Sequence, residues 1–216
     1  LKLNFVGLHI FSGSQNLNSA AIQEAQLKSL QLGISLTEHI PTPMRLLNIG
    51  GGFGVPYFPG EERLDLVVIG ENMQPMIQAF RKQLPETLVA IELGRYMVAE
   101  AGIYVCRVLE RKESRGKIFL ITDGGMHHHL AASGNLGQVI RKNFPVIIGN
   151  RVQDTEKEMA SIVGPLCTPL DLLAEEMMLP KAVAGDLVVV LQSGAYGLSV
   201  SPTAFLNHPL PEEILV

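Results

Sequence analysis

The first part of the chain alternates between short apolar runs and longer amphipathic stretches. The short runs predict three strands, at 5–11, 45–49 and 87–92. The amphipathic stretches predict two helices, at 18–39 and 66–83. Asn18 or Ser19 is the expected N-cap of the first helix. Strands that alternate with helices in this way indicate a parallel sheet or barrel.

After residue 97 the pattern changes to strands separated by turns. Strand-like runs lie at 98–111, 117–123, 162–166 and 186–192. The charged stretch 112–116 is too short for a helix and ends in glycine, which predicts a hairpin turn. A short helix is expected near 170–175. We therefore expect an α/β domain at 1–97 and a mostly β domain at 98–216, packed together without a flexible linker.

Composition is that of a folded protein with a sizeable core. Apolar residues make up 47% of the 216 residues and charged residues 18%, which suits one large domain or two smaller ones. The net charge of −4 argues against a nucleic-acid partner, and no apolar stretch reaches the roughly 18–20 residues of a membrane span. Two cysteines make no disulfide framework, so a cytoplasmic location is expected. The chain opens without Met or a signal-peptide pattern, which predicts that it begins inside a longer protein.

The strand predicted at 87–92 ends abruptly in charge, with Glu92, Gly94 and Arg95. The carboxyl end of a barrel strand is where α/β enzymes keep their chemistry. A carboxylate there can hold a protonated heterocycle, and the forked guanidinium suits a phosphate. The alternative is a buried Glu–Arg ion pair that closes the strand end.

A run of glycines, Gly50 to Gly52 and Gly54, follows the strand predicted at 45–49. Glycines let the backbone approach a ligand closely, and successive N–H groups can cradle a phosphate. The alternative is an ordinary strand-to-loop turn. The neighbouring Arg95 strengthens the phosphate interpretation, because the loops after the last two strands are the usual phosphate site of a barrel.

Two later motifs also carry candidate chemistry. Tyr196 lies among small residues after the strand predicted at 186–192, where it could face a cleft; the alternative is a β-turn with a packing tyrosine. Cys167 lies between a strand and a turn, and most cysteines in such places are small buried hydrophobes.

Together with the segment 7–15, these motifs resemble, in the same order, one family over essentially the whole chain. It is the fold-type III pyridoxal-phosphate-dependent decarboxylases, which act on diaminopimelate, ornithine and arginine. The stretches most similar to the branch described as exosortase-A-system-associated pyridoxal-dependent decarboxylases are 7–16, 48–60, 122–134 and 163–173. The resemblance implies the last strands of a (β/α)₈ barrel at 1–97, a β-rich C-terminal domain at 98–216, pyridoxal 5'-phosphate as cofactor, and a homodimer with shared active sites.

The resemblance also implies roles for matching residues. Glu92 would pair with the pyridine nitrogen of the cofactor and keep the ring an electron sink. Cys167 would reach into the partner subunit's site and reprotonate the product carbanion. The residues expected to hold the cofactor phosphate are Gly50, Gly51, Gly52, Gly94, Arg95 and Tyr196, with Ser14 close by. Phe11 stands where the family usually has a ring-stacking histidine, and it can stack but cannot donate a proton.

Three departures from the family pattern bear on activity. The lysine that binds the cofactor covalently belongs to the first barrel strand, and no lysine of this chain sits in that motif, so the chain alone is expected to be inactive. Thr168 replaces an acidic residue, which favours a substrate that has no free distal amine. This amino-acid substrate could be a free molecule or could be tethered to a carrier protein. His127, His128 and His129 are expected in an extended segment at the surface or pocket rim, where one of them contacts the distal group of the substrate. Neighbours in an extended segment alternate sides, so a zinc site is not favoured and no metal is expected.

Other functions stay open on the sequence. One is a non-catalytic relative that binds pyridoxal phosphate or another phosphate ligand, or acts as a scaffold. Another is an amino-acid racemase on a related barrel, against which the β domain and the Cys167 motif speak.

Overall fold

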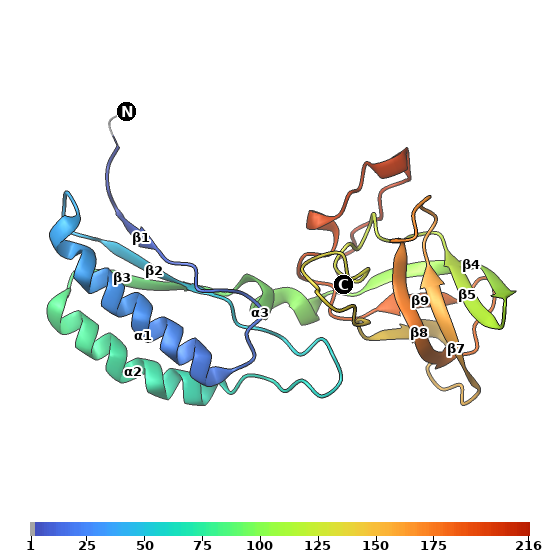
Figure 1. The fold of residues 1–216 in the computed structure, drawn as a ribbon, viewed down its shortest axis with the longest axis horizontal. Helices are drawn as coiled ribbons and strands as arrows, with labels where there is room; N and C mark the ends of the chain where they lie inside the picture. The colour runs from blue at the N-terminus through green and yellow to red at the C-terminus, as the bar shows by residue number, and fades with distance from the viewer. Residues whose placement is uncertain (1–2) are drawn as a thin grey trace. The chain divides into compact units, whose positions relative to one another are not determined.

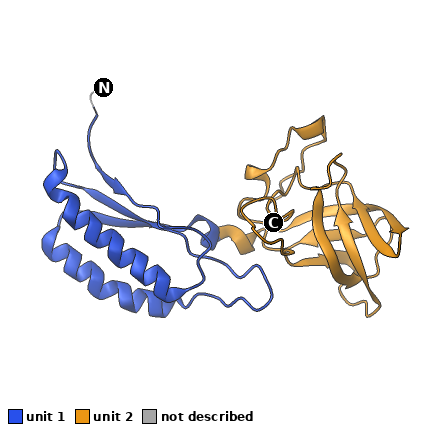
Figure 2. Cartoon of the chain, in the orientation of Figure 1, with its two compact units in different colours: residues 1–97 blue, residues 98–216 orange. Residues whose placement is uncertain are grey.

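The computed structural model describes residues 3–216, which form two compact units (Figure 2). Unit 1 extends to Met97, and unit 2 is Val98–Val216. None of the helices in the described residues is long and apolar enough to cross a membrane.

Unit 1 is a three-stranded parallel sheet with helices on one face (Figure 1). Its strands, in spatial order, are β1 (Gly7–His9), β2 (Leu46–Gly51) and β3 (Leu88–Glu92). Its helices are α1 (Ser19–Ser35), α2 (Leu66–Gln83) and the short α3 (Gly94–Val98), and a 3₁₀ turn, η1 (Leu36–His39), follows α1. The predicted alternation of strands and helices, and the parallel pairing, are confirmed.

Side-chain caps set where the two long helices begin. Asn18 Oδ1 accepts hydrogen bonds from the N–H groups of Ala20 and Ala21, so Asn18 is the N-cap of α1. Asp65 caps α2 in the same way, and α2 keeps both of its predicted bounds. α1 ends earlier than predicted, at Ser35, where the Ser35 hydroxyl donates to a carbonyl of the preceding turn. The predicted helix 18–39 therefore finishes as a 3₁₀ turn.

The core of unit 1 lies between the sheet and the two long helices. Leu47 and Ile49 of β2 pack there with Leu30 of α1 and Phe80 of α2. Successive side chains on a strand point to opposite faces, so Asn48 lies on the face away from this core. That face carries the polar side chains described below.

Unit 2 is a six-stranded sheet in the order β6-β9-β4-β5-β7-β8. Its strands are β4 (Tyr104–Ser114), β5 (Lys117–Thr122), β6 (Val146–Ile148), β7 (Lys157–Val163), β8 (Leu172–Pro180) and β9 (Leu187–Val190), with 3₁₀ turns at η2 (Ala99–Ala101), η3 (Gly149–Arg151), η4 (Leu198–Val200) and η5 (Phe205–Asn207). The β5–β7 pair is parallel and the other described pairs are antiparallel. The first and last strands contact each other, and Asn143 exchanges hydrogen bonds with the backbone of Glu175 next to that contact, so the sheet nearly closes into a barrel.

Four predictions for unit 2 are wrong in detail. The strand predicted at 162–166 is β7 (Lys157–Val163), which begins five residues earlier and ends before the loop 164–171. The strand predicted at 98–111 begins only at Tyr104, because residues up to Ala101 are helical. The helix expected near 170–175 is instead part of β8, where Leu173 and Leu179 are buried and pairing with β7 overrides helical propensity. The turn predicted at 112–116 is shorter, because β4 continues to Ser114 and β5 begins at Lys117. Only Arg115 and Gly116 remain between them, and their positive φ angles of 53° and 74° suit a two-residue hairpin turn.

Candidate functional site

The carboxyl ends of the three strands of unit 1 meet at one edge of the sheet. β1, β2 and β3 are parallel, with His9 opposite Asn48 and Gly51 opposite Glu92. The segments that leave the sheet at this edge contain Ser14, the glycine run and Arg95. The structure therefore brings the cofactor-binding residues predicted in unit 1 to one place.

The Glu92 carboxylate is held by side chains of both other strands. Its Oε1 lies 2.8 Å from His9 Nε2, and its Oε2 accepts a hydrogen bond from Asn48 Nδ2 at 3.1 Å. Asn48 Oδ1 in turn accepts from the Gly50 N–H at 2.9 Å, which links the carboxylate to the glycine run. About half of the Glu92 side chain, 53%, is exposed. The alternative of a buried ion pair between Glu92 and Arg95 is therefore wrong.

The glycine run is required by the chain's own backbone. A Cβ on Gly51 would overlap the carbonyl oxygen of Glu92, and one on Gly52 would overlap that of Gly13. Gly52 also has a φ of +78°, which disfavours any other residue. A Cβ on Gly94, in contrast, would meet no described atom within 4 Å. The glycine run therefore lets β2 pack directly against the end of β3 and the loop after β1. Space for a ligand remains beside Gly94.

Two loops are joined at the same edge. The Gln15 amide donates to the Val55 carbonyl at 2.6 Å and accepts from the Val55 N–H at 3.2 Å. Asn16 exchanges backbone hydrogen bonds with Gly52 and Gly54. These contacts place the exposed Ser14 beside the glycine run.

Phe11 lies just beyond β1, and 70% of it is exposed. Within the described residues, the Phe11 ring is therefore not part of a hydrophobic core. The ring remains available for stacking on a ligand.

Arg95 is oriented by a tyrosine that the sequence did not single out. Its Nη1 donates to the Tyr57 hydroxyl at 3.2 Å, and the guanidinium carbon lies 5.6 Å from the centre of the Tyr57 ring. Tyr57 is buried in the loop that follows the glycine run. The guanidinium is therefore anchored at the edge where the phosphate was predicted.

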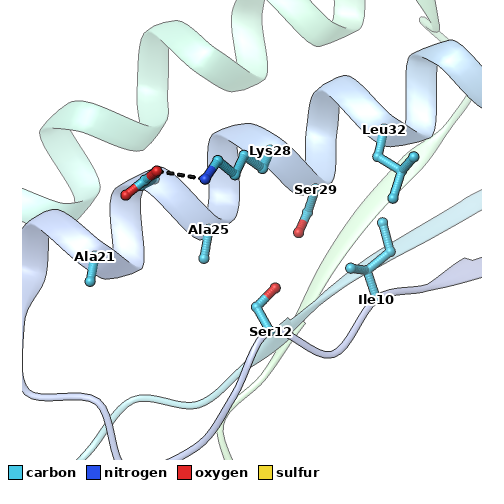
Figure 3. A pocket seen from close by; sticks show the side chains of 8 residues that line it. Ile10, Ser12, Ala21, Ala25, Lys28, Ser29 and Leu32 are labelled. Atoms are coloured by element: carbon cyan, nitrogen blue, oxygen red, sulfur yellow. Dashed lines mark hydrogen bonds and ion pairs between the residues drawn. The ribbon is translucent and has the colours of Figure 1, made fainter.

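A separate groove of about 300 Å³ lies between α1 and the end of β1 (Figure 3). The residues that line it include Ile10, Ser12, Ala21, Ala25, Ser29 and Leu32, with the Glu24–Lys28 ion pair at its side. None of the predicted site residues lines it. Within residues 3–216, no group of three or more His, Cys, Asp or Glu is arranged to hold a metal ion.

In unit 2, Cys167 is exposed at the tip of the loop 164–171. The interpretation of Cys167 as a small buried hydrophobe is therefore wrong. Cys106 is the buried cysteine, and burial raises its pKa to about 12. Thr168, next to Cys167, is half-buried, and its hydroxyl accepts from the Leu170 N–H at 3.3 Å. The loop thus presents a thiol and a neutral hydroxyl at its surface, and its one carboxylate, Asp171, is buried.

The three consecutive histidines lie in a tight turn, which corrects the prediction of an extended segment. The N–H groups of His128 and His129 both donate hydrogen bonds to the Gly125 carbonyl. The centroids of the His127 and His128 rings are 3.8 Å apart. His127 and His129 are fully buried, so the expectation that they lie at the surface or a pocket rim is wrong. Gly124 and Gly125 permit this packing, because a Cβ on Gly124 would overlap the Tyr104 hydroxyl and one on Gly125 would overlap Asp171 Oδ1.

Each histidine has a distinct environment. His128 is partly exposed and contacts the Tyr104 hydroxyl and the Pro209 carbonyl. His129 Nε2 lies 2.9 Å from Ser193 Oγ, and His129 Nδ1 accepts from the Ala132 N–H at 3.1 Å. Burial lowers the pKa of His127 and of His129 to about 4, and both are neutral near pH 7.

Tyr196 lies in a strained loop after β9. Its φ is 54° and that of Gln192 is 55°, which are unusual for residues other than glycine. Such strain persists where the surroundings impose it and is frequent at functional sites. Tyr196 is also partly exposed, which a purely packing role would not require.

Comparison with known proteins identifies the family. The family model described as "Pyridoxal-dependent decarboxylase, C-terminal sheet domain" matches residues 19–194. An L-glutamyl-[BtrI acyl-carrier protein] decarboxylase of Niallia circulans is 46% identical over 215 residues, 98% of this chain and 50% of that protein. A diaminopimelate decarboxylase of Aquifex aeolicus is 29% identical, over 100% of this chain and 48% of its own length.

Solved structures agree with this similarity. Diaminopimelate decarboxylase from M. jannaschii in complex with L-lysine has a TM-score of 0.79 at 25% identity, covering 94% of this chain and 45% of that one. SrLDC in complex with PLP and cadaverine has a TM-score of 0.75 at 30% identity, covering 95% and 50%. The chain spans about half the length of the curated relatives it matches. On this evidence the chain belongs to the pyridoxal-dependent decarboxylase family and contains its C-terminal sheet domain.

Proposed function

We propose that the protein containing this chain is a pyridoxal-phosphate-dependent amino-acid decarboxylase, a carboxy-lyase. Unit 1 would be the C-terminal portion of its cofactor-binding (β/α)₈ barrel. The observation that carries the proposal is the Glu92 carboxylate, oriented by His9 and Asn48 at the carboxyl ends of three parallel strands.

The residues at this edge fit the cofactor chemically. An exposed carboxylate suits a protonated pyridine nitrogen, and Glu92 keeps both oxygens oriented by its two neighbours. Arg95, anchored on Tyr57, supplies positive charge for the phosphate, while the space beside Gly94 admits a ligand close to the backbone. When bound, the cofactor supplies the electron sink for loss of carbon dioxide.

His9 would be a positioning residue for Glu92. His9 is the last residue of β1, and its Nε2 donates to Glu92 Oε1. Phe11, exposed beyond the same strand, would stack on the cofactor ring and transfers no proton. Ser14 and Gly50 to Gly52 would complete the phosphate side of this edge. Tyr196, on its exposed loop in unit 2, would be a further phosphate ligand.

Cys167 would donate the proton that replaces the departing carboxyl group, acting in the site of the partner subunit of a homodimer. Its thiol is exposed, which this role requires. A free exposed thiol also suits the reducing cytoplasm.

The proposed substrate is an amino acid without a free distal amine, tethered to a carrier protein. Two observations support it. Thr168 places a neutral hydroxyl, already bonded to the Leu170 N–H, where a carboxylate would be needed to pair with an ammonium group. In addition, the relative from Niallia circulans is named for a glutamyl group on an acyl-carrier protein.

The test uses the full-length protein with pyridoxal phosphate. We expect a visible absorbance band that borohydride abolishes, and carbon dioxide release from glutamyl-carrier protein faster than from diaminopimelate or lysine. Glu92→Gln should reduce turnover strongly, whereas Glu86→Gln, a carboxylate just before the opposite end of β3, should not. A band without carbon dioxide release from any of these compounds would instead support a non-catalytic relative.

A further inference from the structure

One turn of unit 2, Gly125–Leu130, is bonded to both loops that carry proposed site residues. On one side it contacts the loop 164–171, which presents Cys167. On the other it contacts the loop 192–201, which presents Tyr196. The turn itself contains the three histidines.

Asp171 makes the connection to the Cys167 loop. The side chain is only 3% exposed. Its Oδ1 accepts from the Met126 N–H at 2.6 Å, and its Oδ2 accepts from the Leu166 N–H at 2.8 Å. Leu166 immediately precedes Cys167, so a single carboxylate fixes the thiol-bearing loop to the turn.

Two glycines lie close against the Asp171 carboxylate. A Cβ on Gly125 would overlap Oδ1, and a Cβ on Gly164 would overlap Oδ2. Both segments therefore approach the carboxylate with bare backbone. A buried carboxylate whose two oxygens each accept an N–H is satisfied, and loss of either acceptor leaves a buried donor unpaired.

His129 makes the connection to the Tyr196 loop. The Ser193 hydroxyl donates to the Val190 carbonyl at 2.8 Å, so His129 Nε2 must be the donor in its bond with Ser193 Oγ. Nδ1 is then free to accept from Ala132, which fixes one neutral tautomer. The lowered pKa of His129 agrees with this neutral state.

A second bond holds the far end of the same loop. The Leu130 N–H donates to Ser201 Oγ at 2.8 Å, and the Ser201 hydroxyl donates to the Gly197 carbonyl at 2.6 Å. Ser193 and Gly197 flank Tyr196, so the loop is tied to the turn on both sides of the tyrosine.

We propose that the Gly125–Leu130 turn is the common anchor of the two loops, with Asp171 and His129 as positioning residues that fix Cys167 and Tyr196 relative to each other. The inference rests on the proposed function only in treating Cys167 and Tyr196 as site residues. It gives His129 a positioning role in place of the predicted contact with substrate, because its two ring nitrogens are already bonded inside the unit.

The decisive variant is Asp171→Asn, which preserves size but turns one acceptor into a donor facing an N–H group. Hydrogen exchange of the full-length protein should rise at least about tenfold in the loop 164–171, and also in the loop 192–201, because the shared turn is loosened. Asp154→Asn, an exposed partner of Arg151, is the matched control and should change neither loop. Exchange that rises only in 164–171 would overturn the common anchor, and unchanged exchange in both loops would overturn the role of Asp171.

His129→Gln and His129→Leu test the connection between the turn and the Tyr196 loop. Glutamine retains an N–H donor for Ser193 and should keep most of the protection of the loop 192–201, whereas leucine should lose it. Equal protection in the two variants would refute the role of His129.

Two further measurements do not depend on a variant that folds poorly. In the unmodified protein the Met126 and Leu166 amides should exchange slowly, and rapid exchange would contradict their bonds to Asp171. Ser201→Ala, which removes one hydroxyl, should speed exchange in the loop 192–201, and unchanged exchange there would contradict the bonds of Ser201 to Leu130 and Gly197. These exchange measurements need no turnover, so they can succeed even if the full-length protein decarboxylates none of the compounds tested.

Discussion

The buried, neutral His129 predicts that acid destabilises the protein in a defined pH range. An unfolded histidine titrates near 6.5, whereas burial lowers the pKa of His129 in the folded chain to about 4. As pH falls, the unfolded chain therefore takes up the extra proton first. The stabilisation is complete above pH 6.5 and is lost progressively between 6.5 and 4.

The size of the effect follows from the two pKa values. A difference of one pKa unit corresponds to 1.36 kcal/mol, so the complete transition is worth about 3 kcal/mol. Between about pH 7 and about pH 4.5 the linkage relation gives a loss of about 2 kcal/mol from His129. The side chain is fully buried, so solvent screening reduces this figure little.

Urea unfolding at the two pH values measures the prediction. The free energy of unfolding should fall by about 2 kcal/mol more in the unmodified chain than in His129→Gln, because glutamine does not titrate. Subtraction removes the contributions of other groups, including His127, which shift stability in both proteins. Equal pH dependence in His129→Gln and the unmodified chain would refute the reasoning.

Three further changes test unit 1 and the core of unit 2. Glu92→Gln should lower kcat/KM of the full-length protein by about 10- to 100-fold, the value of a hydrogen bond to a charged group, and steady-state kinetics at saturating cofactor would measure it. Gly51→Ala should destabilise the chain by more than about 3 kcal/mol, because its Cβ overlaps the Glu92 carbonyl, whereas Gly94→Ala should retain the fold. Thermal unfolding compares the two variants, and equal melting temperatures would contradict the close approach of Gly51 to Glu92. Leu120→Ala, at a fully buried position of β5, should cost about 2–5 kcal/mol by urea unfolding, and a loss below 1 kcal/mol would show that the site is not tightly packed.

Local signals explain which elements were predicted well. α2 matches its predicted bounds because Asp65 caps its start and the amphipathic period continues to its end. β8 was missed because Ala174 and the glutamates beside it favour helix, and only pairing with a distant strand makes the segment extended. β6, three residues long, carries too short a pattern to stand out.

The candidate site divides in the same way. Glu92 and Arg95 were identified because a charged strand end is visible in the sequence. Their partners His9, Asn48 and Tyr57 were not, because strand register and loop packing, which no local pattern encodes, bring them together. His9 and Asn48 did leave one signal, since each is a polar residue near the carboxyl end of an apolar strand.

The close backbone approach at the glycine run has a consequence for ligand binding. Gly51 and Gly52 let the end of β3 and the loop after β1 pack directly against β2, and the side chains of Asn48 and Gln15 add bonds there, so this surface is preorganised. No flexible loop would have to become ordered when a phosphate binds, so little conformational entropy would be lost on association. The affinity of this edge for a phosphate should therefore depend mainly on ionic strength, which screens the charge of Arg95. It should depend less on temperature, because no loop has to become ordered.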